Sequence, residues 1–499
     1  MSERAGLSPM VAGRAVAAWQ VWLPSWPWIV GVLAMLRALA SPLALLHDPD
    51  TYLHIAAGRW MLAHGALPTA DPFSFTMAGA HWAPSEWLDE VTLALAYDAA
   101  AWGGVIVLTA ACFGLAAGRL CSFLSRRFDP LPSVIGAMAG AVLVLPHLLA
   151  RPHVLALPVM VLWCGGIFAA RDDDRGPPWL LLPVMVLWAN LHASFLFGIA
   201  LTGFLGGEAF LAANGRSARW MEARRWGAFA VAAAATALIN ANGVTALVQP
   251  FRLMAMPALQ AGFDEWRAAD LGQFPALEAW LLGVVALGFL AGAKLPWTRL
   301  VLLLGLIHMA LAHVRHADLL GLVAPLAIAA ALGPRLAELT AMAADSSLLR
   351  GAAMFARPAA LSGRLVMLAL AGVISLPMML HRIDRSGDAI TPQAALEVAR
   401  RLNLTGPVFT SEPFGGYLIF SGVPTFIDGR VELYGNAFLA DYLAAERGDA
   451  AMLTGLLDRY HIAWALVQTG APLVGAFDRL QGWRRAYADD QAMVYQRGD

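Results

Sequence analysis

Long runs of apolar residues recur over the first 381 positions of the chain, and short polar stretches separate them. A helix needs about 20 apolar residues to cross a bilayer, and fewer where neighbouring protein encloses it. The pattern predicts about 11 transmembrane helices. They lie near residues 28–46, 102–124, 131–150, 153–170, 179–191, 193–211, 226–241, 276–293, 299–313, 319–333 and 364–381. The neighbouring runs at 179–191 and 193–211 also fit one broken or re-entrant element.

Basic residues are distributed unevenly between alternate loops. If the N-terminus is cytoplasmic, one set of loops collects Arg126, Arg127, Arg171, Arg175, Arg216, Arg219, Arg224, Arg225, Lys294, Arg299, Arg335, Arg350 and Arg357. The opposite loops hold only Arg59, Arg151, Arg252, Arg267 and Arg315. Because cytoplasmic loops are enriched in Lys and Arg, we expect a multi-pass membrane protein with its C-terminus outside. Lysine occurs once, at Lys294, and arginine supplies the remaining positive charge, which is typical of a GC-rich bacterial genome and indicates the cytoplasmic (inner) membrane.

The pattern changes after the last apolar run. Thr391-Pro392 is typical of a helix start, and Gly406 of a helix end. Short β-rich runs alternate with helical patterns near 436–446 and 449–460. These runs are Val408–Thr410, Tyr417–Phe420, Thr425–Ile427, Ala465–Gln468 and Met493–Gln496. The sequence therefore predicts a helical membrane domain over 1–381, including a first outer loop at 47–101, and a small extracytoplasmic α/β domain over 382–499.

Composition narrows the function classes. The chain is 59% hydrophobic and 14% charged, with a formal net charge of -1. A nucleic-acid partner would require a concentrated basic face, so that class is set aside. The three cysteines, Cys112, Cys121 and Cys164, lie inside apolar runs, which argues against a disulfide framework or a cysteine zinc site.

The first outer loop carries the most concentrated polar motif. It opens with His47-Asp48-Pro49-Asp50, and His54, Arg59 and Glu86 follow. Asp50, His54 and Glu86 are expected to start or flank short helices along the membrane surface. Carboxylates at such a position serve as general bases or metal ligands when burial and neighbouring charges shift their pKa. Helix capping at a solvated interface explains the same spacing, and the pattern alone leaves both explanations open.

Other polar residues recur at the ends of the predicted spans on the same side. Each of them is individually explained as a polar residue at a helix end that hydrogen-bonds to interfacial water. Together, however, they place a polar or ionisable group beside the membrane in nearly every outer loop. Placing an ionisable group in or beside the bilayer costs free energy, so such groups often have a function. The candidate binding residues are His54, Arg59, Glu86, Arg151, His153, His192, Asn240, Glu265, Arg315 and His316.

At the first loop the sequence resembles the GT-C superfamily of membrane glycosyltransferases, in the bacterial branch that uses polyprenyl-phosphate sugars. The resemblance rests on Asp48-Pro49-Asp50 directly after the first span, on the interface helices that follow, and on many spans joined to a soluble C-terminal domain. It implies inverting transfer of a sugar from a polyprenyl-phosphate carrier to a lipid-linked or cell-envelope acceptor.

The resemblance also implies roles for particular residues. Asp48 or Asp50 would be the base for the acceptor hydroxyl, while Arg151, His153, Arg315 and His316 would hold the carrier phosphate. The C-terminal domain would roof the polar face near Asp428-Gly429-Arg430, although Asp428 and Arg430 could simply pair in a turn. A divalent metal as cofactor stays open. The C-terminal domain shows no sequon-reading motif of the kind found in oligosaccharyltransferases, which argues against protein N-glycosylation.

A transporter or a non-catalytic scaffold that binds lipid-linked glycans is the rival class. Secondary transporters commonly contain internal repeats and polar groups near the bilayer midplane. This sequence shows no clear repeat, and its polar residues gather at one face with a soluble domain. The pattern therefore favours an enzyme at the membrane interface.

Overall fold

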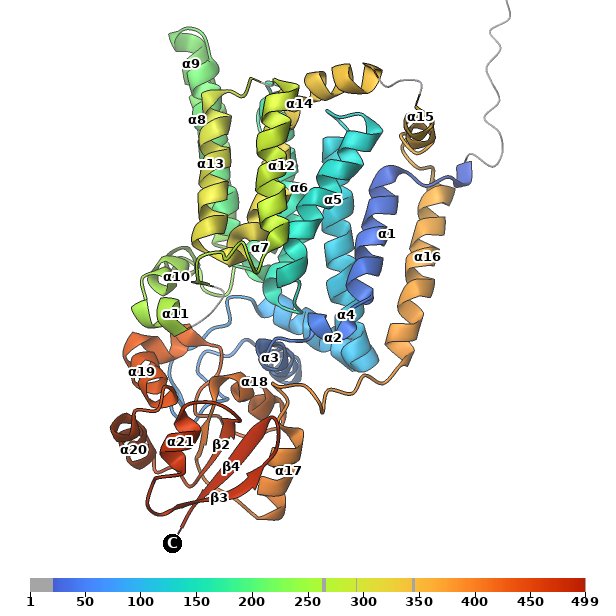
Figure 1. Cartoon of the computed structure of the whole chain (residues 1–499). Helices are drawn as coiled ribbons and strands as arrows, with labels where there is room; N and C mark the ends of the chain where they lie inside the picture. The colour runs from blue at the N-terminus through green and yellow to red at the C-terminus, as the bar shows by residue number, and fades with distance from the viewer. Residues whose placement is uncertain (1–20, 263–265, 293, 343–345, 499) are drawn as a thin grey trace, which may run out of the picture.

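The computed structural model describes residues 21–262, 266–292, 294–342 and 346–498, and it consists of a helical bundle with a smaller domain at one end (Figure 1). We call this end of the bundle the domain end and the opposite one the far end. The bundle helices are α1 (Trp26–Leu39), α4 (Trp87–Leu124), α5 (Pro130–Val144), α6 (Pro152–Asp172), α7 (Leu182–Leu191), α8 (Phe195–Ala212), α9 (Arg216–Ala237), α12 (Pro275–Ala291), α13 (Trp297–Ala312), α14 (Ala317–Met342) and α16 (Leu361–Leu380).

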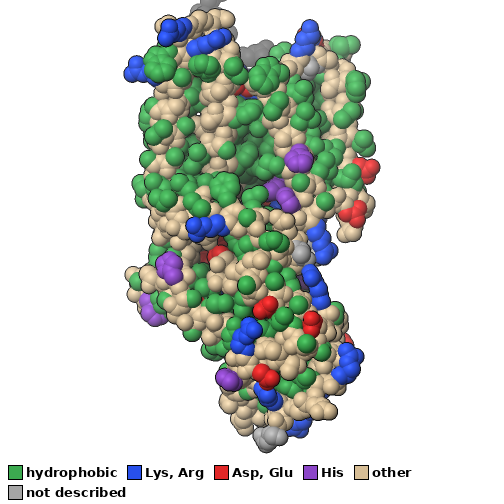
Figure 2. All heavy atoms as spheres, turned by 90° about the vertical axis from the view of Figure 1, so that its left-hand side faces the viewer, with side chains coloured by type: hydrophobic (Ala, Val, Ile, Leu, Met, Phe, Trp, Pro, Cys, Tyr) green, Lys and Arg blue, Asp and Glu red, His purple; other side chains and the backbone are tan. Residues whose placement is uncertain are grey.

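Each predicted span overlaps one of these helices, and the pair at 179–191 and 193–211 forms two separate helices, α7 and α8. By length and composition, 6 helices of the described chain suffice to cross a membrane. Apolar side chains cover the bundle face over α8, α9 and α13, and basic side chains gather at the far end (Figure 2). The chain is thus a multi-pass membrane protein.

Short helices complete the two ends of the bundle. They are α2 (Pro42–Leu45), α3 (Asp50–His64), α10 (Thr245–Met254), α11 (Pro257–Gly262) and α15 (Ser347–Met354), with 3-10 turns at Leu145–His147, Trp179–Leu181 and Val314–His316. Small residues allow the long helices to approach closely. A Cβ added to Gly114 of α4 would lie 2.6 Å from the carbonyl oxygen of Gly31 in α1. Such small-residue contacts are typical of helix packing in membranes.

Helix α4 breaks where the sequence predicts the second span to begin. Ala100 and Ala101 have non-helical backbone angles, with φ of 48° and ψ of -140° at Ala101. The break separates the first part of α4 from its apolar continuation. This first part packs on α3, where a Cβ on Gly58 would lie 2.0 Å from the carbonyl oxygen of Glu90. The first loop is therefore a pair of packed helices across the domain end of the bundle.

The C-terminal domain contains a mixed four-stranded sheet in the order β1-β2-β4-β3. Its strands are β1 (Val408–Thr410), β2 (Trp464–Gln468), β3 (Trp483–Ala488) and β4 (Ala492–Arg497). Strands β1 and β2 are parallel, and the other two pairings are antiparallel. The helices are α17 (Gln393–Arg401), α18 (Glu412–Phe420), α19 (Val431–Glu446), α20 (Ala450–Arg459) and α21 (Leu473–Phe477). The small α/β character predicted for this region is confirmed.

Two of the predicted strands are wrong. Residues Tyr417–Phe420 belong to helix α18, and Thr425–Ile427 contributes only an isolated bridge between Thr425 and Ser74. Phe414 and Leu418 of α18 are fully buried, and a short apolar run of this kind does not distinguish a buried helix from a strand. Strand β3 was missed because its residues, including Arg484 and Arg485, lie at an exposed sheet edge.

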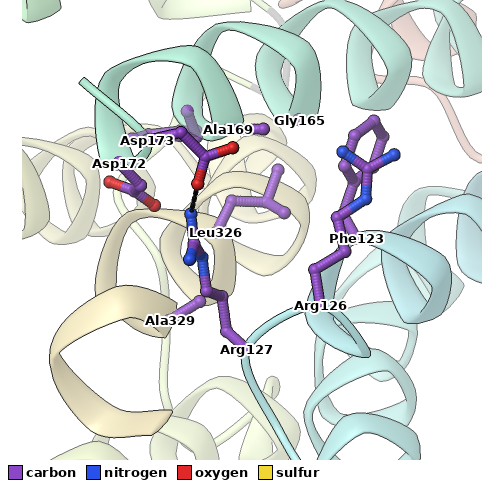
Figure 3. Close-up of a pocket in the computed structure, with 10 residues that line it drawn as sticks. Phe123, Arg126, Arg127, Gly165, Ala169, Asp172, Asp173, Leu326 and Ala329 are labelled. Carbon is purple, nitrogen blue, oxygen red and sulfur yellow. Dashed lines mark hydrogen bonds and ion pairs between the residues drawn. The ribbon is translucent and has the colours of Figure 1, made fainter. Parts of the chain in front are cut away.

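Buried ion pairs join three helices at the far end. Arg299 of α13 is 4% exposed, and its guanidinium lies 2.8 Å from a carboxylate oxygen of Asp172 in α6 and 2.8 Å from one of Glu208 in α8. A pocket of about 230 Å³ lies beside them, and Figure 3 shows Asp173 paired with Arg127 at its edge. These charges are held by their partners because isolated ions are costly away from water.

We expect Arg299→Met to destabilise the protein by about 3 kcal/mol or more, because it leaves the buried Asp172 without its ion-pair partner and leaves Glu208 with Arg171 alone. Thermal unfolding of the purified protein measures the change. Arg335→Met is the matched control, since Arg335 pairs with Glu338 at the exposed surface and should cost less than about 1 kcal/mol. Equal effects of the two substitutions would contradict this account of the far end.

Candidate functional site

One arginine holds both aspartates of the first-loop motif. Asp50 begins α3, and Arg151 directly precedes α6 as its N-cap residue. Arg151 Nε lies 2.7 Å from Asp48 Oδ2, and Arg151 Nη2 lies 2.7 Å from Asp50 Oδ2. The backbone N–H of Asp50 donates to Asp48 Oδ1 at 2.8 Å. The guanidinium fork thus fixes two carboxylates side by side.

The two aspartates differ in their surroundings. The side chain of Asp48 is 2% exposed and that of Asp50 is 15% exposed. Burial raises the pKa of Asp48 to about 6; Arg151 opposes this shift and the Asp50 carboxylate adds to it. Asp48 therefore has both carboxylate oxygens engaged within the protein, while Asp50 lies nearer to solvent.

Histidines and carboxylates continue the site along α3 and α4. His54 Nδ1 lies 3.4 Å from Glu90 Oε1, and Glu86 Oε1 lies 3.6 Å from His192 Nε2. Burial lowers the pKa of His54, but the hydrogen bond and the charge of Glu90 outweigh it and raise the value to about 9. Burial raises the pKa of Glu86 to about 7. His54 is consequently protonated at neutral pH, where it lies beside the Glu90 carboxyl group.

A second group of basic residues adjoins this cluster. His153 Nε2 lies 3.7 Å from Asp318 Oδ2, and the rings of His153 and His192 are 6.3 Å apart. Burial lowers the pKa of His192 well below its usual value, and the neighbouring His153 and Arg315 lower it further. The structure therefore brings together His54, Glu86, Arg151, His153, His192 and Arg315 from the set of predicted site residues.

Other predicted site residues have local partners. Arg59 pairs with Asp98 at the exposed surface and lies over the Tyr97 ring. The side-chain amide of Asn240 donates to the carbonyl oxygen of Ala237, and its oxygen accepts the N–H of Asn242, as expected of a residue that closes a turn. His316 contacts the carbonyl oxygen of Met309. Glu265 lies outside the described residues.

The C-terminal domain contributes a loop to the site. A Cβ on Gly429 would lie 1.9 Å from Asp50 Oδ1, so only glycine leaves room for that carboxylate. Arg430 fixes the loop: it is 4% exposed and donates to Asp428 at 2.7 Å and to Asp71 of the first loop at 2.6 Å. Arg430 also lies 4.6 Å from the centre of the Trp82 ring. Arg430 therefore pairs with Asp428 in its own domain and also with Asp71 in the first loop.

Several acidic residues of the site were not among the predicted site residues. Glu412 at the start of α18 is one, and burial raises its pKa well above the usual value, with the Asp50 carboxylate adding to the shift. Asp89 is fully buried, and neither of its oxygens has a hydrogen-bond partner in the described chain. Asp89 and Glu90 could have been found as an acidic pair before an apolar run, whereas Glu412 had no local signal.

The carboxylates that the structure describes in the site are not arranged as a metal centre. In the described part of the chain no group of three or more His, Cys, Asp or Glu side chains is placed to hold a metal ion. Arg151 already supplies a positive charge to both Asp48 and Asp50. The residues present therefore do not fit a divalent cation between the two aspartates.

Comparison with solved structures identifies the fold. The oligosaccharyltransferase AglB of Archaeoglobus fulgidus, solved with an inhibitory peptide and a dolichol-phosphate, matches with a TM-score of 0.56 and 12% identity over 96% of this chain and 74% of that chain. The apo oligosaccharyltransferase of Archaeoglobus fulgidus matches with a TM-score of 0.55 and 12% identity over 89% and 69% of the two chains. Apo ArnT of Cupriavidus metallidurans gives a TM-score of 0.49 and 14% identity over 94% and 97%.

No protein-family model and no curated protein sequence matches the chain. The structural likeness covers most of the chain at an identity that establishes the fold alone. The chain thus has the fold of the GT-C membrane glycosyltransferases, and the resemblance predicted from the first-loop motif is confirmed at the level of fold.

The stability of the protein should depend on pH through His54. Because the folded-state pKa of about 9 exceeds the ordinary value of 6.5, the stabilisation by His54 is complete below pH 6.5 and is lost as the pH rises to about 9. We expect the midpoint of thermal unfolding to fall over this range and the fall to be smaller in His54→Gln. His64→Gln, an exposed substitution on the same helix, should keep the wild-type slope. A wild-type slope in His54→Gln would contradict the proposed ionic pair.

Proposed function

We propose that the chain is an inverting glycosyltransferase that moves a sugar from a polyprenyl-phosphate carrier to a lipid-linked or cell-envelope acceptor. The observation that carries the proposal is the pair of aspartates, Asp48 and Asp50, held by Arg151 beneath the C-terminal domain. The GT-C fold supports it, and so does the dolichol-phosphate bound to the archaeal protein that shares this fold.

We assign the role of general base to Asp50. Its carboxylate is the more exposed of the two, while both oxygens of Asp48 are engaged by Arg151 and by the Asp50 backbone. The acceptor hydroxyl gives its proton to Asp50 as its oxygen attacks the anomeric carbon. The bond from that carbon to the phosphate oxygen breaks, and the electron pair leaves with the polyprenyl phosphate. Asp48 positions Arg151, and Arg151 positions Asp50.

The carrier phosphate is assigned to the basic residues next to the aspartates. Arg315 and His153 lie close enough to His192 for their charges to lower its pKa, and Arg151 contributes in the same direction. A guanidinium fork binds phosphate oxygens through paired hydrogen bonds. Burial raises the pKa of Glu412 well above its usual value, and a protonated carboxyl group at this position would donate a hydrogen bond to a sugar hydroxyl.

The proposal includes an orientation and a domain division. The basic loops of the predicted cytoplasmic side follow helix ends at the far end of the bundle, so the positive-inside rule favours an orientation with the domain end and its site outside the cytoplasmic membrane. The bundle over 1–381 would hold the carrier, and the domain over 382–499 would close the acceptor side. All of the roughly 11 bundle helices would then cross or line the membrane.

Replacing Asp50 by asparagine should reduce transfer by about 100- to 10,000-fold while the protein stays folded, because the amide has a similar shape but no basicity. The measurement is sugar transfer in proteoliposomes with a polyprenyl-phosphate-linked donor. Asp458→Asn is the control, since Asp458 also pairs with an arginine, Arg497, but at the exposed surface.

A comparison of Asp48→Asn with Asp50→Asn shows which of the two aspartates is the base. Loss of transfer in Asp48→Asn together with normal transfer in Asp50→Asn would make Asp48 the base. Full activity of both variants would exclude the aspartate mechanism and favour a transporter or a glycan-binding scaffold.

A methyl group on Gly429 should disturb Asp50 without removing it. In Gly429→Ala the new Cβ would meet Asp50 Oδ1 at 1.9 Å, so the carboxylate must turn away from Arg151. We expect kcat to fall by about 100-fold, as for other small misplacements of a reacting group. Gly455→Ala in α20 is the control because its Cβ would meet nothing within 4 Å. Wild-type kcat in Gly429→Ala would show that the domain loop does not position the base.

A further inference from the structure

A second cavity lies outside the cluster of aspartates and histidines, at the break in α4. It has a volume of about 620 Å³ and is formed between the break and the end of α16. We call it the α4–α16 groove. It is lined by Tyr97, Ala100, Ala101, Trp102, Met379, Leu380, His381, Arg382, Ile383 and Asp384.

The apolar half of the groove opens toward the surface that faces lipid. Helix α16 lies at the edge of the bundle (Figure 1), and Leu376 and Leu380 near its end are 52% and 75% exposed. Tyr97 and Trp102 flank the break, and such aromatic residues concentrate where a membrane meets water. We therefore infer that the groove lies at the level of lipid headgroups.

The polar half of the groove carries one arginine, Arg382, with a histidine and an aspartate beside it. Arg382 and His381 are exposed, and in the described chain their side chains have no hydrogen bond or ion pair. Asp384, also in the lining, is occupied locally: its carboxylate accepts from the N–H and the hydroxyl of Ser386, each at 2.9 Å. Asp384 is therefore not paired with Arg382, and the N–H donors of the Arg382 guanidinium have no partner in the described chain.

The inner wall of the groove is fixed in place. The Trp102 ring packs edge-on against Tyr52 at 5.0 Å and Tyr97 at 4.9 Å, and the buried guanidinium of Arg385 lies 4.5 Å from its centre. Arg385 donates to the carbonyl oxygen of Leu46 at 2.6 Å. Because this wall is held by α3 and the segment after α16, the groove exists before any ligand enters.

We propose that the α4–α16 groove binds an anionic membrane phospholipid, with the phosphate on Arg382 and the start of the acyl chains against Trp102, Met379 and Leu380. A guanidinium fork matches phosphate oxygens, and the apolar lining takes the adjoining hydrocarbon. The lipid fills the space at the break, where α16 and the segment to the C-terminal domain meet α4. This site is separate from the proposed carrier site and does not depend on the proposed transfer reaction.

Native mass spectrometry of the delipidated full chain tests the proposal, with phosphatidylglycerol and phosphatidylcholine of the same acyl chains. We expect phosphatidylglycerol to bind more tightly, and Arg382→Ala to weaken it by about tenfold, as for the loss of one charged hydrogen bond. Arg357→Ala is the matched control because Arg357 is also exposed and without a partner in the described chain, but precedes the other end of α16.

Two results would overturn the proposal. One is unchanged phosphatidylglycerol binding in Arg382→Ala. The other is competition by millimolar inorganic phosphate that removes the lipid completely, which would identify a site for free phosphate. Neither result bears on sugar transfer, so failure here is distinguishable from failure of the proposed function.

Discussion

The arrangement of the site depends on the contact of Arg151 with Asp48 and Asp50. Two carboxylates this close repel each other, and burial of Asp48 raises the cost of its charge. The single guanidinium offsets both effects and connects the start of α6 to the start of α3. An asparagine or a lysine in place of Arg151 could not hold both oxygens in one plane. The geometry of the pair is therefore a property of the packed bundle.

The C-terminal domain is fixed to this pair by buried charge. Arg430 lies between Asp428 of its own domain and Asp71 of the first loop, and Tyr434 donates to Asp428 at 2.7 Å. Because all four side chains are almost fully buried, separating the domain from the bundle would expose or unpair them. The loop at Gly429 is held against Asp50 as a consequence. The domain is part of the site rather than an appendage on a linker.

The break in α4 links the membrane domain to the site. It turns the first part of the helix across the domain end, so that Glu90 reaches His54 and Glu86 reaches His192, while the remainder of α4 continues as an apolar span. A single unbroken helix would carry these carboxylates away from α3. The strained backbone at Ala101 is compatible with the observation that unusual backbone angles concentrate near functional sites. The same break creates the groove beside α16.

The sequence by itself determined the membrane class, the approximate positions of the spans and the first-loop motif. These features are local. The length of an apolar run determines whether a helix can span the membrane, and the Asp48-Pro49-Asp50 motif is visible in the sequence itself. It also predicted that Arg151 would lie near the aspartates, because the alternation of spans places both at one end of the bundle. The sequence misassigned Tyr417–Phe420, the end of α18, as a strand, since a short apolar run does not show the periodicity that separates a helix from a strand.

Only the tertiary structure decided which polar residues share a site. Asn240 and Arg59 have the residue types of a site but find local partners, while Glu412 and Gly429 reach Asp50 from positions far along the chain. No spacing pattern encodes those approaches, because they depend on how the C-terminal domain packs on α3. The physical reason is that charge pairing and close packing act through space, whereas the sequence displays only what acts along the chain.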